Sequence, residues 1–229
     1  MAQNGLYKQG LWFYGVIIGL AIKESLVDVF PHLISFQQSD TRVIWFESVR
    51  LLVFLALSIR FYLGSVIFFE KAYGRPDSDK VYRRKSFGLD FLFGFLHFLL
   101  FFALAMSIDL DKNRKHWFSV FVGAILLYDV PWLIASRNLS TRHLIKMWTA
   151  INSLTFVLAA ATYSVIRSWQ EDALWAELCA YFWIMLANAI DMAEMITEKE
   201  IIKDRLQKFI TRPDQSGSME PIKEVPPRD

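Results

Sequence analysis

Between Ile44 and Phe69 the chain reads IWFESVRLLVFLALSIRFYLGSVIFF. Apolar residues dominate this stretch, which is longer than the roughly 20 helical residues that cross a hydrocarbon core about 30 Å thick. It lacks the period-2 alternation of a membrane β-barrel strand. Backbone groups in lipid must also form their hydrogen bonds within the segment. The stretch therefore predicts a transmembrane α-helix.

Similar apolar blocks recur along the 229 residues, of which 54% are hydrophobic. Charged residues gather between the blocks, as they do between the spans of membrane proteins. We expect an all-α integral membrane protein, a bundle of about six transmembrane helices. The approximate spans are residues 11–33, 44–69, 87–108, 117–136, 144–166 and 173–196.

The first of these spans differs from the others, because its apolar run is short. The run from Leu11 to Ile22 is followed by Lys23, Glu24 and Asp28. A secretory signal peptide is the alternative interpretation, since Lys8 precedes the run, but no small-residue cleavage pattern follows it. We expect a membrane helix with a polar face turned toward its neighbours.

The distribution of Lys and Arg predicts the orientation of the spans. With the N-terminus in the cytoplasm, seventeen of these residues lie in the inner loops and the two terminal segments, and five lie in the outer loops. Cytoplasmic loops carry such an excess of cations. We therefore expect both termini in the cytoplasm, in a multi-pass protein of the cell membrane.

The composition changes near the C-terminus. From residue 212 onward the chain is rich in Pro, Ser and charged residues, which favours disorder. We expect a transmembrane helical domain over residues 1–211 and a disordered cytoplasmic tail over residues 212–229. The single Cys179 excludes internal disulfides, and a net charge of +2 gives no reason to expect nucleic acid as a partner.

Ionisable and amide side chains inside the spans are the candidate functional residues, because such groups are costly in hydrocarbon and face protein or water. Their depths sort them into an inner and an outer layer, with one histidine near mid-membrane. The candidates for an ion pathway or intramembrane polar network are Arg60, Asp90, His97, Asp129, Asn152, Asn188, Asp191 and Glu194. The outer polar layer consists of Lys23, Glu24, Asp28, Glu47 and Arg50.

Two interpretations of these layers stay open. In the first, the residues form structural pairs that hold helices together. The pairs at matching depth are Arg60 with Asp90 or Asp129, and Arg50 with Glu24 or Asp28. In the second, the surplus of inner carboxylates is protonated, solvated or neutralised by a cation in a water-filled vestibule.

His97 is predicted to lie alone near the middle of its span. Asp90 stands seven residues earlier, so both share one helix face. The pair would form half of a metal or proton site, or His97 is a buried packing residue. The sequence contains no cysteine pair, phosphate-binding glycine loop or HExxH motif. We therefore expect no metal, no cofactor and no catalytic residues.

A basic segment separates the second and third spans. Its candidate cations are Arg75, Lys80, Arg83, Arg84 and Lys85. They contribute to the cytoplasmic excess of positive charge, and such clusters beside a membrane also bind anionic lipid headgroups. Both roles stay open, because the same electrostatics serves both.

Small residues indicate close helix packing at several positions. Gly15 and Gly19 form a GxxxG step, and Gly64, Gly88 and Gly94 allow close approach elsewhere. We expect packing within the chain, with a seam between copies as the alternative.

Two prolines predict a bend or a helix end, Pro31 and Pro131. Because Pro131 follows Asp129 closely, carbonyl groups freed by the proline would lie beside a carboxylate. That arrangement would suit an ion or a water molecule.

The function expected first is a channel or pore-forming subunit, a homo-oligomer that favours cations through its intramembrane carboxylates. The second is a non-conducting scaffold, sensor or effector subunit, including one of a defence system. It would act through a cytoplasmic protein partner of the C-terminal segment. The third is a proton-coupled transporter, with Glu24, Asp28 and His97 as relays, or an intramembrane enzyme. The expected surroundings in every case are a lipid bilayer.

Overall fold

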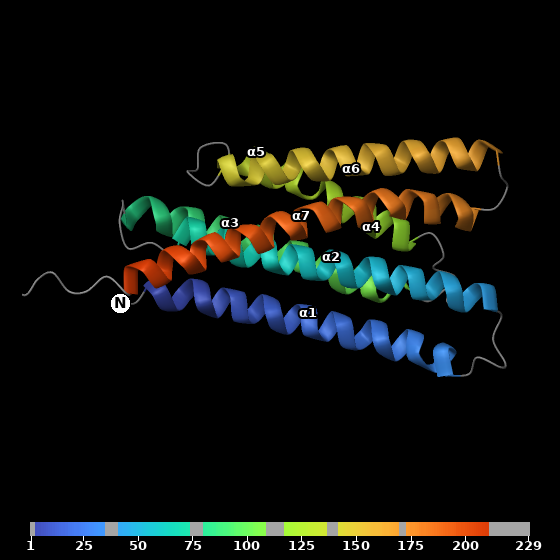
Figure 1. The fold of residues 1–229 in the computed structure, drawn as a ribbon, viewed down its shortest axis with the longest axis horizontal. Helices are drawn as coiled ribbons and strands as arrows, with labels where there is room; N and C mark the ends of the chain where they lie inside the picture. Colours follow the sequence, from blue (N-terminus) through green and yellow to red (C-terminus); the bar gives the residue numbers. More distant parts are fainter. Residues whose placement is uncertain are drawn as a thin grey trace, which may run out of the picture. The chain divides into compact units, whose positions relative to one another are not determined.

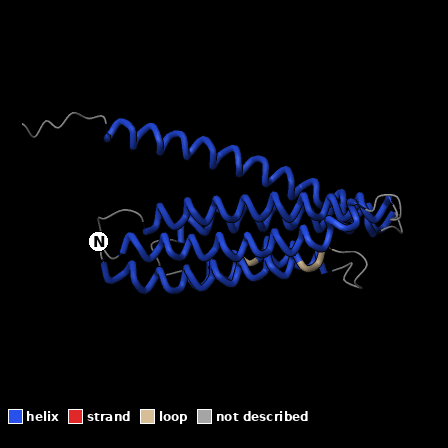
Figure 2. The backbone as a smooth tube through the Cα atoms, turned by 90° about the horizontal axis from the view of Figure 1, so that it is seen from below, coloured by secondary structure: helices blue, strands red, loops and turns tan. Residues whose placement is uncertain are grey.

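The computed structural model describes residues 3–34, 41–73, 80–108, 117–136, 142–169 and 173–210. Helix is the only regular element in these ranges, as the tube of Figure 2 shows. The elements are α1 (Gln3–Ile34), α2 (Thr41–Tyr73), α3 (Lys80–Ala105), α4 (Trp117–Leu127), α5 (Asp129–Ala135), α6 (Arg142–Trp169) and α7 (Ala173–Ile210). The prediction of an all-α protein is confirmed. The tail predicted over residues 212–229 lies outside the described residues.

Five helical segments of the described chain are long and apolar enough to cross a membrane. They are Thr41–Tyr73, Phe87–Ala105, Trp117–Ala135, Ile145–Trp169 and Leu174–Met195. These segments correspond to the last five predicted spans, so the chain has the character of a multi-pass membrane protein. The first predicted span is also helical, since it lies within α1, but it is not among the five.

The chain divides into two compact units, residues 1–192 and 193–229. In the first unit, successive long helices run in opposite directions (Figure 1). Helix α1 packs on α2 and α3, α4 lies against α3 and α6, and α5 packs on α6. Of the second unit the structure describes the continuation of α7 from Ala193 to Ile210, which is helical.

An aromatic cluster joins α1 to α2 and α3. The Tyr14 ring is fully buried, and its centroid lies 4.7 Å from that of Phe98, 5.4 Å from Phe91 and 5.7 Å from Phe69. Its hydroxyl donates a hydrogen bond of 2.7 Å to the Phe91 carbonyl oxygen. Aromatic contacts of this kind stabilise a core beyond their area alone. The dense phenylalanines of α3 therefore anchor α1.

Gly94 allows this cluster to form, because the Tyr14 ring lies against its backbone. A Cβ atom at Gly94 would overlap the Tyr14 ring, which other rings hold in place. We expect Gly94→Ala to lower the free energy of unfolding by about 1–3 kcal/mol, as overpacking does. Chemical unfolding in micelles measures the change.

Gly88→Ala is the matched control, since nothing lies within 4 Å of a Cβ atom built at Gly88 on the same helix. It should be neutral or stabilising, because alanine has the higher helix propensity. Equal effects of the two variants would contradict a packing role for Gly94. Gly19 of the GxxxG step also has nothing within 4 Å, so it forms no tight contact within the described chain.

The predicted break in the fourth span is present at Tyr128, between α4 and α5. Pro131 has no backbone N–H, so the carbonyl oxygen one turn earlier in the helix does not receive its usual hydrogen bond. The Tyr128 N–H donates instead to the Ile125 carbonyl oxygen at 3.3 Å. The Thr149 hydroxyl lies 3.3 Å from the Asp129 carbonyl oxygen. The other proline, Pro31, lies inside α1, close to the last residue of that helix.

Candidate functional site

Buried polar side chains from five helices meet inside the first unit. We call Arg60, Asp191, Asn188, Asn152, Asp129 and His97 the Arg60 cluster. Each of these six side chains is buried. They come from α2, α3, α5, α6 and α7, so residues far apart in the sequence share one polar interior.

Arg60 is the centre of this cluster. Its Nε donates to Asp191 Oδ2 at 2.6 Å, and its Nη2 forms an ion pair with the same oxygen. Nη2 also donates to Asn152 Oδ1 at 2.8 Å, while Nη1 lies 3.4 Å from Asn188 Oδ1. The guanidinium group is thus surrounded by oxygen acceptors, as a buried cation requires. Arg60 pairs with Asp191 and not, as expected, with Asp90 or Asp129.

Asn152 extends the cluster toward a second carboxylate. Its Nδ2 donates to Asp129 Oδ2 at 2.6 Å. The other oxygen, Oδ1, lies 3.9 Å from Nδ1 of His97. The prediction that His97 stands alone is therefore wrong, because α5 brings a carboxylate beside it. Aromatic rings enclose the imidazole, with centroids 4.6 Å away for Phe61 and 4.8 Å away for Tyr128.

Asp90 belongs to a different set of contacts. The Tyr73 hydroxyl donates to Asp90 Oδ2 at 2.5 Å, and Trp132 Nε1 donates to Oδ1 at 2.9 Å. The carboxylate is fully buried and joins α2, α3 and α5. Buried carboxylates need such donors. This arrangement favours the structural interpretation for Asp90.

A second arginine forms what we call the Arg50 cluster, with Glu177, Tyr181 and Ser119. Arg50 Nη2 donates to Glu177 Oε2 at 2.7 Å, and the Tyr181 hydroxyl donates to the same oxygen at 3.1 Å. Ser119 Oγ lies 3.0 Å from the Tyr181 hydroxyl. Arg50 itself is fully buried. The expectation named Glu24 or Asp28 as its partner, and the structure adds Glu177, which the expectation did not name.

The remaining residues of the outer polar layer differ from one another in burial. Lys23 and Glu24 approach each other at 3.8 Å, with their side chains 68% and 40% exposed. Asp28 is half-buried, and Glu47 is fully buried on α2, one turn before Arg50. The outer layer therefore splits into a partly exposed set on α1 and a buried set on α2.

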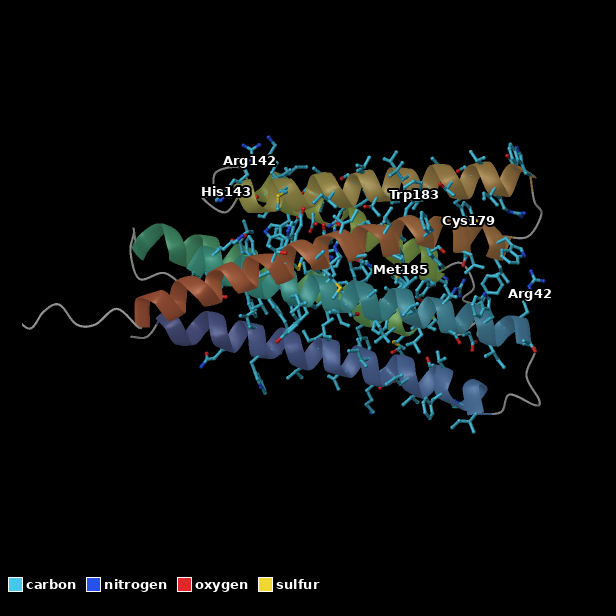
Figure 3. All side chains as sticks on the ribbon, in the orientation of Figure 1. Arg42, Arg142, His143, Cys179, Trp183 and Met185 are labelled. Carbon is cyan, nitrogen blue, oxygen red and sulfur yellow. The ribbon has the colours of Figure 1, made fainter. Side chains whose placement is uncertain are left out.

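The other predicted residues are Glu194 and the basic residues between the second and third predicted spans. Glu194 is exposed on α7 and takes no part in the hydrogen bonds given for the Arg60 cluster. Lys80, Arg83, Arg84 and Lys85 begin α3, but their side chains lie outside the described part, as does Arg75. Arg142 and His143 are exposed at the start of α6, at the opposite end of the first unit from Arg42 (Figure 3).

Sequence reasoning missed five residues that complete these contacts. They are Glu177, Tyr181 and Ser119 of the Arg50 cluster, and Tyr73 and Trp132 beside Asp90. Glu177 carries the one signal that was available, since it lies at the depth of Arg50, near the start of the last span. The aromatic donors carry no such signal, because tyrosine and tryptophan near span ends also mark the membrane interface.

In both clusters, long polar side chains connect helix α7 to another helix of the first unit. Arg50 and Arg60 of α2 bind Glu177 and Asp191 of α7. Trp183 Nε1 of α7 donates to the Thr162 hydroxyl of α6 at 2.8 Å. Polar contacts between helices thus position α7 where apolar packing alone would leave its rotation undetermined.

Among the described residues, no three His, Cys, Asp or Glu side chains come together in a way that would hold a metal ion. The Arg60 cluster can instead share a proton or accept a monovalent cation, because it combines carboxylates, amides and an imidazole. Comparisons with protein-family models, curated proteins and solved structures find no match to this chain. The functional argument therefore rests on the geometry of these clusters.

Proposed function

We propose that this chain is a six-span protein of the cell membrane, with both termini cytoplasmic, that passes cations as the pore-forming subunit of a homo-oligomer. The span that this proposal adds to the five apolar segments is α1, the first helix of the chain. It packs on α2 and α3, and it exposes the apolar side chains of Trp12, Leu20, Val27 and Phe30. Apolar groups on the outer surface of a membrane helix are compatible with contact to lipid. The excess of Lys and Arg in the predicted inner segments supports the orientation.

The observation that carries the proposal is the charge balance of the Arg60 cluster. It contains two carboxylates, Asp129 and Asp191, and one arginine, all buried. With both carboxylates ionised and a neutral His97, the cluster carries one excess negative charge. A cation at Asp129 would neutralise that charge, and the low dielectric of the interior strengthens the attraction.

Unsatisfied polar atoms near Asp129 support hydration of this region. His97 Nε2, Tyr128 Oη and Asn188 Nδ2 are buried and have no hydrogen-bond partner within the described chain. Buried polar atoms without a protein partner are commonly satisfied by ordered water. Water at these atoms would let a proton or a small cation approach the Asp129 carboxylate.

The packing of a single chain supports the proposal of a homo-oligomer. Large side chains fill the interior next to the cluster, including Phe54, Leu57 and Phe101, which are fully buried. A continuous aqueous path therefore needs surfaces from more than one copy, or a displacement of these side chains. Assemblies of identical membrane subunits supply such surfaces by symmetry.

Asp129→Asn is expected to change cation flux through vesicles that contain the purified protein, because it removes the excess negative charge. We expect cation flux to fall about tenfold or more, the effect of losing roughly 1.4 kcal/mol of attraction. Flux is measured with fluorescent ion and pH indicators in liposomes, under an imposed gradient.

Glu70→Gln is the matched control, since Glu70 is an exposed carboxylate of α2 outside both clusters. It should leave flux unchanged. Selective flux that Asp129→Asn does not alter would remove Asp129 from the pathway. The absence of flux from folded, inserted wild-type protein would reject the pore.

A second candidate is a non-conducting membrane subunit, favoured by the pairing within the clusters. Asp191 already binds Arg60, and Asp90 already accepts two hydrogen bonds. In that case the cytoplasmic segment after Ile210 would bind a protein partner, and the basic residues at the start of α3 would contact anionic lipid headgroups. Truncation after Ile210 would then abolish function, whereas neutralising the cluster would mainly lower stability.

A further inference from the structure

A pocket of about 210 Å³ lies within the first unit between α4, α6 and α7. Its hollow comes from small residues at the places where larger ones would fill the space: Gly123 on α4, Ala159 and Ala160 on α6, and Ala180 on α7. Phe156, Leu126 and Ile184 add apolar walls. An apolar cavity of about 150 Å³ is large enough to hold benzene, so this pocket accommodates an apolar group of somewhat greater size.

Polar groups of the Arg50 cluster form one part of the lining. Glu177, Tyr181 and Ser119 all border the pocket. Their polar atoms already bind one another and Arg50, at 2.7 Å for the ion pair, 3.1 Å for the tyrosine and 3.0 Å for the serine. Arg50 thus supplies a positive charge beside the Glu177 carboxylate.

The surroundings of the pocket identify its occupant. All three helices that line it belong to segments with the length and apolar character of membrane spans. Val120 and Val157, which neighbour lining residues on α4 and α6, are exposed, as is Leu186 on α7. Hydrocarbon is the medium around such a surface. An apolar pocket that opens to hydrocarbon is filled by hydrocarbon, because an empty one loses the dispersion contacts of its walls.

We propose that this pocket binds the acyl chain of a membrane lipid. The chain lies against Ala159, Ala160 and Ala180 and shields the Glu177–Arg50 ion pair from water. Exclusion of water lowers the local dielectric and strengthens that pair. The bound chain therefore supports the contact between α2 and α7. This inference does not depend on whether the protein passes cations.

Photolabelling tests the proposal directly. The full-length protein is reconstituted in phosphatidylcholine vesicles that contain a phosphatidylcholine with a diazirine at the end of one acyl chain. Peptide mass spectrometry then locates the adducts. We expect them to concentrate on the pocket residues of α4, α6 and α7, including the segment from Phe156 to Ser164. Adducts spread evenly over the exposed apolar surface would overturn the proposal.

Two neighbouring alanines provide a matched pair of variants. Ala160 lines the pocket, whereas Ala161 is exposed on the same helix and does not line it. Ala160→Leu should reduce pocket adducts severalfold, and Ala161→Leu should leave them unchanged. Ser164→Leu, at an exposed lining position, serves as a second pocket variant if Ala160→Leu does not fold. Equal labelling of pocket and control variants would contradict a bound chain at this place.

Native mass spectrometry of the purified protein distinguishes a lipid from another apolar molecule. A retained phospholipid mass that is lost in the Ala160→Leu variant, but kept in Ala161→Leu, is the expected result. A retained non-lipid compound with the same dependence on Ala160 would overturn the assignment to an acyl chain.

Discussion

Asp191→Ala is expected to lower the free energy of unfolding by about 3–5 kcal/mol, because it leaves the Arg60 guanidinium buried without its carboxylate. Arg60 is 3% exposed and Asp191 is 5% exposed, so the ion pair that the substitution breaks is buried. The oxygens of Asn152 and Asn188 remain as acceptors but carry no charge. Unfolding in micelles, followed by circular dichroism, measures the change.

Two further variants separate the loss of the pair from general damage to α7. Glu194→Ala changes an exposed carboxylate on the same helix and should shift stability by no more than about 0.5 kcal/mol. The double variant Arg60→Leu with Asp191→Leu should recover much of the loss, since apolar residues of similar volume replace a buried pair well. A loss near 0.6 kcal/mol for Asp191→Ala, the average for polar contacts between membrane helices, would show that the ion pair adds nothing beyond them.

Glu177→Ala is the second change with a large expected effect. Arg50 is fully buried, and Glu177 is 3% exposed, so removal of the carboxylate breaks an ion pair in a low-dielectric interior. We expect a loss of about 3–5 kcal/mol. Part of the change comes from the Tyr181 hydroxyl, which loses its acceptor at 3.1 Å. The measurement is the same unfolding assay.

Glu24→Ala is the comparison for this variant, because it removes the carboxylate of a partly exposed ion pair on α1. Lys23 and Glu24 lie 3.8 Å apart with exposed side chains, and such pairs contribute about 0–1 kcal/mol. A double-mutant cycle with Arg50→Leu gives the coupling energy of Arg50 and Glu177. Coupling no larger than that of the exposed pair would contradict the assignment of Arg50 and Glu177 as a contact that stabilises the packing of α2 on α7.

The two ion pairs differ in the effects that variants beside them should have on function and on stability. Arg50 with Glu177 balances charge and borders an apolar pocket. Arg60 with Asp191 balances charge as well, but its neighbour Asp129 adds a second carboxylate beside His97. Stability and flux should therefore separate: Asp129→Asn alters flux more than stability, since the Arg60–Asp191 pair stays intact. Variants of Glu177 should alter stability first.

The boundaries of the helices were accessible from local features of the sequence. The predicted span over residues 44–69 lies inside α2, and the break predicted at Pro131 occurs three residues earlier, at Tyr128. Both follow from properties of short segments, namely hydropathy and the missing N–H of proline. The depth of each polar residue within its span could also be predicted, because it depends only on the number of residues from the end of that span. Arg60, Asn152 and Asp191 were placed in one layer, and the structure brings them into contact.

Which side chains pair with one another could not be predicted from the sequence in the same way. Arg60 had four carboxylates in its predicted layer, and the counting of residues cannot tell which faces it. Rotation of each helix about its own axis decides this, and rotation depends on packing between helices that are far apart in the sequence. Tyr14 against Gly94 is one such contact, since it sets how α1 lies on α3.

The sequence by itself thus determined that the chain forms apolar helices of membrane-spanning length with charged residues inside them, because these properties depend on residue type and position along each segment. Only the tertiary structure decided that Arg50 binds Glu177, that Arg60 binds Asp191, that Asp129 lies beside His97, and that small residues leave a pocket between α4, α6 and α7. Each of these depends on side chains from separate helices meeting in space. Their meeting is set by helix rotation and packing, which no single segment encodes.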